Sequence, residues 1–396
     1  MHWNTILKIL FLFSASGQLA IGRFYDERLN IFGINIASII SIVYILSSIL
    51  LLFSIKNIVI NRTKLIYYIF YAFIIVVNPL LWLAFGLNDT LGPNDYGLLK
   101  YLNLTFLFIP ISIIIIEKFS YKDSRNMLFI LFGVVLFLAF LALFGFAISK
   151  NSDAQRLSVL GGGPIIFSRW MGFGILFLLF FPSRKKMFLR FLLAILLFIL
   201  ALGSGSRGPI LTLFVILLIF LLLNFNKQFL RVSFFLFFIL VGVKFSGLDT
   251  KLSDFGKVKR IYMNYSEAGF NQKSSSTRTH LFQGGLLVIQ NFPFGVGSGN
   301  WQLKANELNP SNLMPLEYPH NIFLEVSTDY GIFAGVLLIF FFLHIFYLSF
   351  NKMIFYIRDS TSLYPLLFYL LIFFFLNSLI SGDMNDSRLL FVIISF

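Results

Sequence analysis

The sequence predicts an all-α protein that crosses a membrane many times. Hydrophobic residues make up 58% of the 396 positions, 53 positions are Phe, and the mean hydropathy is +0.87. No soluble core of this size can hide so much apolar surface from water. The apolar residues also form separate segments of about 20 residues, the length that a helix needs to cross the hydrocarbon core. One long polar stretch, from about Gly247 to Pro319, interrupts them.

Eleven segments meet or approach the length of a spanning helix. They are residues 5–21, 31–55, 65–86, 98–116, 127–148, 164–182, 188–203, 209–224, 232–247, 321–350 and 361–381. The last segment, Leu389–Phe396, is too short to cross, so we expect a re-entrant end or a marginal twelfth element. The chain then divides into N-terminal transmembrane helices (1–246), a large loop (247–319) and C-terminal transmembrane helices (320–396).

Basic residues in the short loops predict the orientation, because Lys and Arg are retained on the cytoplasmic side. One set of alternate loops is rich in them: Lys56, Arg62 and Lys64; Lys118, Lys122 and Arg125; Arg184, Lys185, Lys186 and Arg190; Lys227 and Arg231; Lys352 and Arg358. We therefore expect a cytoplasmic N-terminus, with residues 5–21 retained as the first span rather than cleaved as a signal peptide, and the 247–319 loop outside. The net charge of +14 mostly reflects this topology, and without a continuous basic patch we expect no nucleic-acid partner.

Four arginines are candidates for binding an anionic group at the outer face: Arg156, Arg169, Arg207 and Arg278. Charged residues in or beside apolar spans are costly and indicate function by default. Glycines near Arg156 and Arg207 let the backbone approach a ligand, and a guanidinium can hold a phosphate through two hydrogen bonds. Two or more converging arginines would suit a diphosphate. The alternative is that Arg156 faces lipid headgroups and that Arg207 only packs in a tight turn.

His320 is the favoured general base among four histidines. It immediately precedes a predicted helix, whose positive N-terminal dipole disfavours imidazolium and keeps the ring neutral, as a base must be. Either Glu317 or Glu325 could orient it. The alternative is a surface histidine that caps the helix.

The other three histidines are less suitable. His2 is at the cytoplasmic end, and His344 follows about 24 residues after His320, roughly 36 Å along a continuous helix. His280, two residues after Arg278, remains a rival. The chain has no cysteine, which excludes thiol catalysis and Cys-ligated metal sites.

Several motifs occur in a fixed order in the second half of the chain. Ser206-Arg207-Gly208 lies between two spans, and Arg278 begins an amphipathic helix that ends at Pro293-Phe294-Gly295-Val296-Gly297. His320-Asn321 and then Asp329-Tyr330-Gly331-Ile332-Phe333-Ala334-Gly335 follow. The glycine run itself is expected to be a turn, because its spacing does not fit a dinucleotide-binding loop. Over about residues 150–390, this set resembles the O-antigen ligase and Wzy-type O-antigen polymerase superfamily.

The resemblance implies a GT-C-type membrane fold and a metal-independent, inverting glycosyl transfer on the periplasmic face of the bacterial inner membrane. The donor and acceptor would be undecaprenyl-pyrophosphate-linked glycans, with membrane lipids and a chain-length regulator protein as further partners and no cofactor. Arg207 and Arg278 would bind the pyrophosphate, with Arg156 and Arg169 as further matches. His320 would activate the acceptor hydroxyl, supported by Asn321.

Within the superfamily, the sequence favours a polysaccharide polymerase over a ligase that transfers the glycan to lipid A core. The Ser381-Gly382-Asp383 to Arg388 ending and Gly161-Gly162-Gly163-Pro164 favour it. A lipid-linked oligosaccharide flippase is a further alternative, but it would not need a large outer loop that carries an Arg and a His. Asp26-Glu27 resembles the acidic motif of metal-dependent GT-C enzymes, but the flanking Arg23 and Arg28 favour a self-paired loop, so we expect no metal site.

Overall fold

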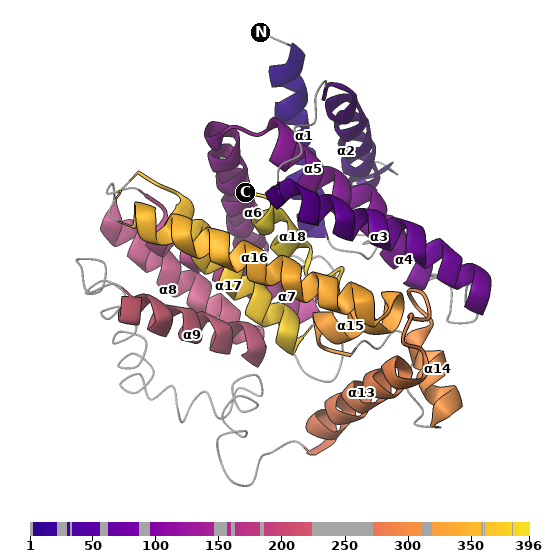
Figure 1. Cartoon of the computed structure of the whole chain (residues 1–396). Coiled ribbons are helices and arrows are strands. Elements are labelled where there is room, and N and C mark those ends of the chain that lie inside the picture. Colours follow the sequence, from indigo (N-terminus) through magenta and orange to yellow (C-terminus); the bar gives the residue numbers. More distant parts are fainter. Residues whose placement is uncertain are drawn as a thin grey trace.

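A computed structural model describes residues 3–21, 30–31, 34–55, 62–86, 96–145, 157–159, 163–182, 186–223, 272–309, 319–357, 359, 361–381 and 383–396. This part of the chain is almost entirely helical, as predicted (Figure 1). Its only strands are β1 (Asn30–Ile31) and β2 (Ile34–Asn35), which form a short antiparallel pair before α2.

The N-terminal helices are, in order, α1 (Trp3–Ile21), α2 (Ile36–Phe53), α3 (Arg62–Phe85), α4 (Tyr96–Asn103), the π-helix η3 (Leu104–Phe108), α5 (Ile109–Lys118) and α6 (Tyr121–Leu143). A capping box starts α6: the Ser120 hydroxyl accepts from the Asp123 N–H, and the Asp123 carboxylate accepts from the Ser120 N–H. The same carboxylate pairs with Lys8 of α1 at 2.7 Å, which joins the two helices.

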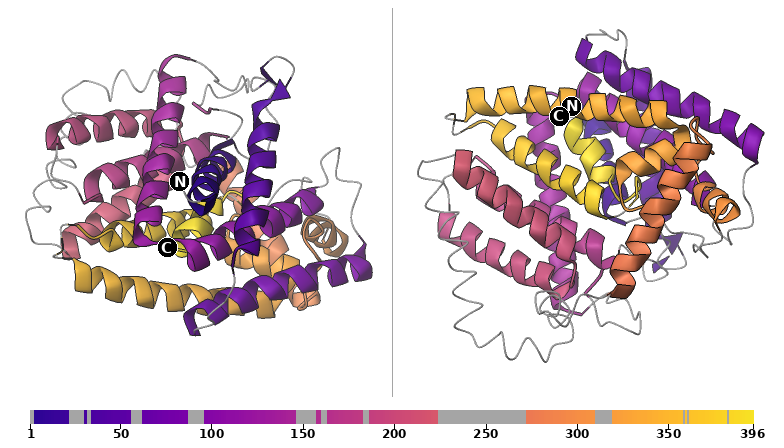
Figure 2. Two further views of the ribbon diagram at one scale, coloured as in Figure 1. Left: turned by 90° about the horizontal axis from the view of Figure 1, so that it is seen from above. Right: turned by 60° about the horizontal axis from the view of Figure 1, so that its bottom comes forward.

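The remaining helices are α7 (Gly163–Phe180), α8 (Met187–Gly203), α9 (Arg207–Leu223), α13 (Gln272–Asn291), α14 (Trp301–Leu308), α15 (Ile322–Tyr330), α16 (Ile332–Tyr356), α17 (Tyr364–Ile380) and α18 (Arg388–Ile394). The helix α7 is central: 72% of its residues are buried, whereas only 22% of the residues of the peripheral α2 are buried. It contacts α6, α8, α9 and α17. Two views show α13 and α14 at one end of the helical body, beside α15 (Figure 2).

The protein is a polytopic membrane protein. Six of the described helical segments are long and apolar enough to span a bilayer: Ile36–Phe53, Lys64–Phe85, Lys100–Lys118, Tyr121–Leu143, Gly163–Phe180 and Ile332–Tyr356. Four shorter apolar helices also match expected spans: Thr5–Ala20, Met187–Gly203, Arg207–Leu223 and Tyr364–Ile380. The expected span 232–247 lies outside the described residues.

The predicted continuous helix over 321–350 is wrong. The chain breaks at Gly331, whose φ of 93° ends α15 and separates it from α16. His344 therefore lies twelve residues into a 25-residue helix, near its middle rather than at the opposite face. At the end of the chain, α18 is fully buried and packs against η3, α5 and α17.

Candidate active site

His320 lies at the start of α15 in an unusual backbone conformation. Asn321 is the N-cap, and its side-chain oxygen accepts hydrogen bonds from the N–H groups of Phe323 (3.0 Å) and Leu324 (3.1 Å). This confirms the helix start predicted after His320. The φ of His320 is 59°, in the left-handed region, which costs about 1–3 kcal/mol for a residue other than glycine. Such strain persists only where the surroundings fix it, and it is concentrated at functional sites.

The His320 imidazole is held in its neutral form. Burial, and after it the positive charge of Arg278, lowers the pKa of His320 to about 4. Arg278 is exposed on α13, which packs against α15. The structure thus brings together two of the predicted site residues, and at neutral pH the imidazole can accept a proton.

The glycine-rich segment 293–300 packs against the end of α15 and forms turns, as expected. The N–H groups of Val296 and Gly297 donate to the carbonyls of Thr328 and Asp329, at 3.0 and 2.8 Å. This close packing requires a glycine at position 331, because a Cβ there would lie only 2.7 Å from the backbone of Phe294. These contacts fix α15 at the end away from His320.

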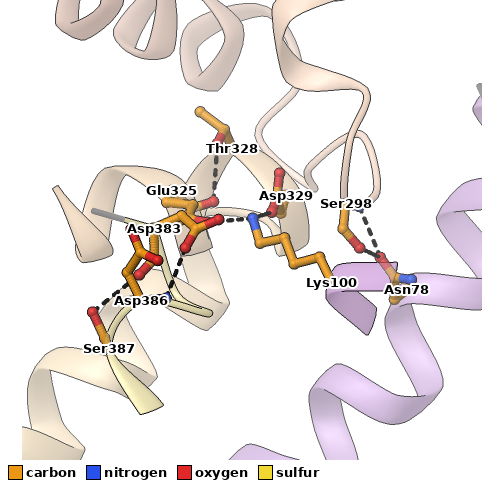
Figure 3. Close-up of polar contacts among 9 residues, drawn as sticks. All are labelled: Asn78, Lys100, Ser298, Glu325, Thr328, Asp329, Asp383, Asp386 and Ser387. Carbon is orange, nitrogen blue, oxygen red and sulfur yellow. Dashed lines mark hydrogen bonds and ion pairs between the residues drawn. The ribbon is translucent and has the colours of Figure 1, made fainter. Parts of the chain in front are cut away.

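A buried cluster of charges lies on the inner face of α15. The Lys100 ammonium group, from α4, contacts carboxylate oxygens of both Glu325 and Asp329 (Figure 3). The three side chains are 2%, 1% and 0% exposed. The buried Asp383 lies beside them, and its carboxylate accepts from the Asp386 N–H at 2.8 Å. Glu325 therefore pairs with Lys100, and any influence on His320 passes through the helix rather than through the predicted direct contact.

Arg169 is placed differently from Arg207 and Arg278. It is 3% exposed on α7, and its amino groups donate to the backbone carbonyls of Asn377 (3.1 Å), Ser381 and Asp386 (2.9 Å). These bonds hold the C-terminal end of α17 and the turn that follows it. The geometry gives Arg169 a structural task, because its two terminal amino groups already donate to backbone carbonyls.

Arg207 is the first residue of α9 and is half-buried, in the turn between two helices that the sequence indicated. Its neighbour Gly208 faces Ser381, and a Cβ on Gly208 would lie 3.7 Å from the Ser381 hydroxyl. The start of α9 thus abuts the end of α17, next to the turn that carries Asp383.

Several other residues discussed from the sequence do not join this site or are not described. Arg156, Glu317, His2 and the Asp26-Glu27 pair are outside the described residues, so their roles remain predictions. The rival His280 is exposed on α13, two residues after Arg278.

A cavity of about 450 Å³ lies between α3, α5, α6, α16 and α17. Its lining includes Lys352 and Ser349 of α16, so it is at the end of that helix opposite to α15. None of the predicted site residues lines it. This cavity is therefore not part of the candidate site around His320 and Arg278.

Arg207, Arg278 and His320 all fall within residues 191–339, which match a family model described as O-antigen ligase. The match supports the resemblance of this part of the chain to the O-antigen ligase and Wzy superfamily. This superfamily consists of enzymes that transfer glycans, so the match supports a function of the ligase or polymerase type. No curated protein matches the chain.

Lys100 is the residue of this region that sequence reasoning missed. It lies in the predicted span 98–116 and outside the segment that matches the superfamily. A lone charge at the start of an apolar span was the available signal, because such residues are functional candidates by default. Its partners could not be identified from sequence, since Lys100 and Asp329 are 229 positions apart.

Proposed function

We propose that this protein is an inverting membrane glycosyltransferase that polymerises undecaprenyl-pyrophosphate-linked repeat units of an O-antigen or capsular polysaccharide. The observation that carries the proposal is the half-buried His320, in a left-handed backbone conformation at the start of α15, beside the helix α13 that carries Arg278. Burial and the Arg278 charge lower the pKa of His320. A base and a cation side by side suit a reaction in which a hydroxyl attacks and an anion departs.

In the proposed reaction, His320 accepts the proton of the acceptor hydroxyl as its oxygen bonds to the anomeric carbon of the donor sugar. The bond from that carbon to the pyrophosphate oxygen breaks, and the electron pair leaves with the pyrophosphate. A single displacement of this kind inverts the anomeric centre. Arg278 and Arg207 neutralise the departing charge by bidentate hydrogen bonds, the role that a metal ion has in other transferases.

Donor binding also adjusts the base. The pyrophosphate would offset the charge of Arg278, which is one of the two causes of the low His320 pKa. The imidazole then becomes a better proton acceptor when the donor is in place. The site would face the periplasm, with the protein in the inner membrane and its N-terminus in the cytoplasm.

An O-antigen ligase that transfers the glycan to lipid A core is the second candidate, because that is the description of the matching family model. The lipopolysaccharide of a strain lacking this protein separates the two. Core plus a single repeat supports the polymerase, whereas core without repeats supports the ligase or a flippase. A flippase defect leaves the lipid-linked glycan in the cytoplasmic leaflet, and a ligase defect leaves it in the periplasmic leaflet.

A further inference from the structure

Lys100 is a buried cation with two buried carboxylate partners on one helix. Glu325 and Asp329 are four residues apart, so both side chains project from the same face of α15. The Lys100 ammonium group lies between them and joins α4 to α15 (Figure 3). Burying a cation and two carboxyl groups away from water is costly.

The contact between α4 and α15 is reinforced by backbone packing. Gly97, one turn before Lys100, lies against the Ser298 carbonyl, where an added Cβ would be only 2.2 Å away. The glycine-rich segment that contains Ser298 in turn donates backbone hydrogen bonds to the carbonyls of Thr328 and Asp329. The helix α4, the glycine-rich segment and α15 therefore form one tightly connected unit.

This unit reaches His320 within one helical turn. The Glu325 N–H donates to the Asn321 carbonyl at 2.9 Å, which is the first hydrogen bond of α15. A shift of α15 at Glu325 would move Asn321 and its neighbour His320. The left-handed backbone of His320 is stable only while this surrounding structure holds it.

We propose that Lys100 is a positioning residue: by holding Glu325 and Asp329 it fixes α15, and with it the orientation of His320. The inference rests on the function proposed above. Stability alone gives a weaker explanation for the cluster, because neutral side chains of similar size are often as stable as a buried ion pair. We therefore assign the cluster the task of fixing the relative position of α4 and α15, a role that buried ionic groups have in some proteins.

The test uses the full-length purified protein with neutral substitutions of similar size. Lys100→Met is compared with the triple variant Lys100→Met/Glu325→Gln/Asp329→Asn, which removes Lys100 together with both carboxylates that it contacts. The matched control is Lys304→Met/Glu307→Gln, which removes an ion pair of 2.7 Å on α14 with side chains 22% and 58% exposed. Melting curves, kcat and donor KM are measured for each.

Protonation of His320 is followed separately, by deuterium exchange at the imidazole C2 carbon with peptide mass spectrometry as a function of pH. The triple variant is expected to fold and to lose about 10²-fold in kcat, with little change in KM, because small displacements of a catalytic group have effects of that size. The exchange midpoint of His320 is expected to rise toward the ordinary histidine value as its environment loosens. The control should change neither quantity.

A triple variant with wild-type kcat and an unchanged His320 midpoint overturns the inference and assigns the cluster to stability alone. A fall in kcat with a fixed midpoint overturns it as well, because the environment of His320 would then be independent of the cluster. The exchange measurement does not require activity, so it tests this inference independently of the proposed function. The proposed function itself would fail if a His320→Ala protein transferred glycan normally.

Discussion

The exposed Arg278 on α13 and the half-buried His320 before α15 lie close enough for the arginine charge to lower the histidine pKa. They are held near each other by the packing of α13 against α15. Under the proposed function, this relationship links the base to the donor-binding charge and predicts a defined dependence of the activity on pH.

In the wild type, the decrease of kcat/KM at acid pH (the acid limb) should occur well below the usual pKa of histidine. Protonated His320 cannot accept a proton, so activity should fall only as the pH approaches the lowered pKa of about 4. Arg278→Gln removes one cause of that lowering, so the limb should move to higher pH, while burial keeps it below the ordinary value. A wild-type limb at the ordinary histidine pKa, or a limb that does not move in Arg278→Gln, would contradict this assignment. His280→Gln serves as the control.

Arg207→Lys and Arg278→Lys should each lose most of the transfer activity. Lysine keeps the charge but not the planar fork that binds pyrophosphate through two hydrogen bonds. The measurement is polymer length in complemented strains, with protein levels compared by immunoblot. Normal ladders from both lysine variants would assign these arginines to topology or packing.

Arg169 should behave differently, as a residue needed for stability. Arg169→Met removes donors to the carbonyls of Ser381 and Asp386 in the turn after α17, at a cost of about 1–3 kcal/mol for each acceptor left unsatisfied. We expect a lower melting temperature and less protein in the membrane. A variant that melts like the wild type but has a raised donor KM would instead place Arg169 in the pyrophosphate site.

The helices around this site could be predicted from the sequence, but the contacts between them could not. Apolar segments predicted most of the described helices, and the onset of the apolar segment at residue 321 predicted the helix start just after His320. The break at Gly331 was missed, although Glu325, Thr328 and Asp329 interrupt the apolar pattern just before it. Neither the Lys100 pairing nor the buried placement of Arg169 could be predicted, because each depends on partners more than 200 positions away.

Transfer by the purified protein should persist in excess EDTA, because donor activation is assigned to arginines. The competing possibility is a divalent ion held by Asp26 and Glu27 against the pyrophosphate. Activity that vanishes with chelator, returns with Mg²⁺ and is lost in Asp26→Asn would move the site to the first outer loop.

The rate of glycan transfer by purified His320→Ala tests the central claim most directly. We predict a fall of about 10²–10⁴-fold, the usual effect of removing a positioned general base, in a protein that inserts and melts like the wild type. His280→Ala should retain its rate. A His320→Ala protein with wild-type transfer would contradict the account, and a simultaneous loss in His280→Ala would identify that histidine as the base.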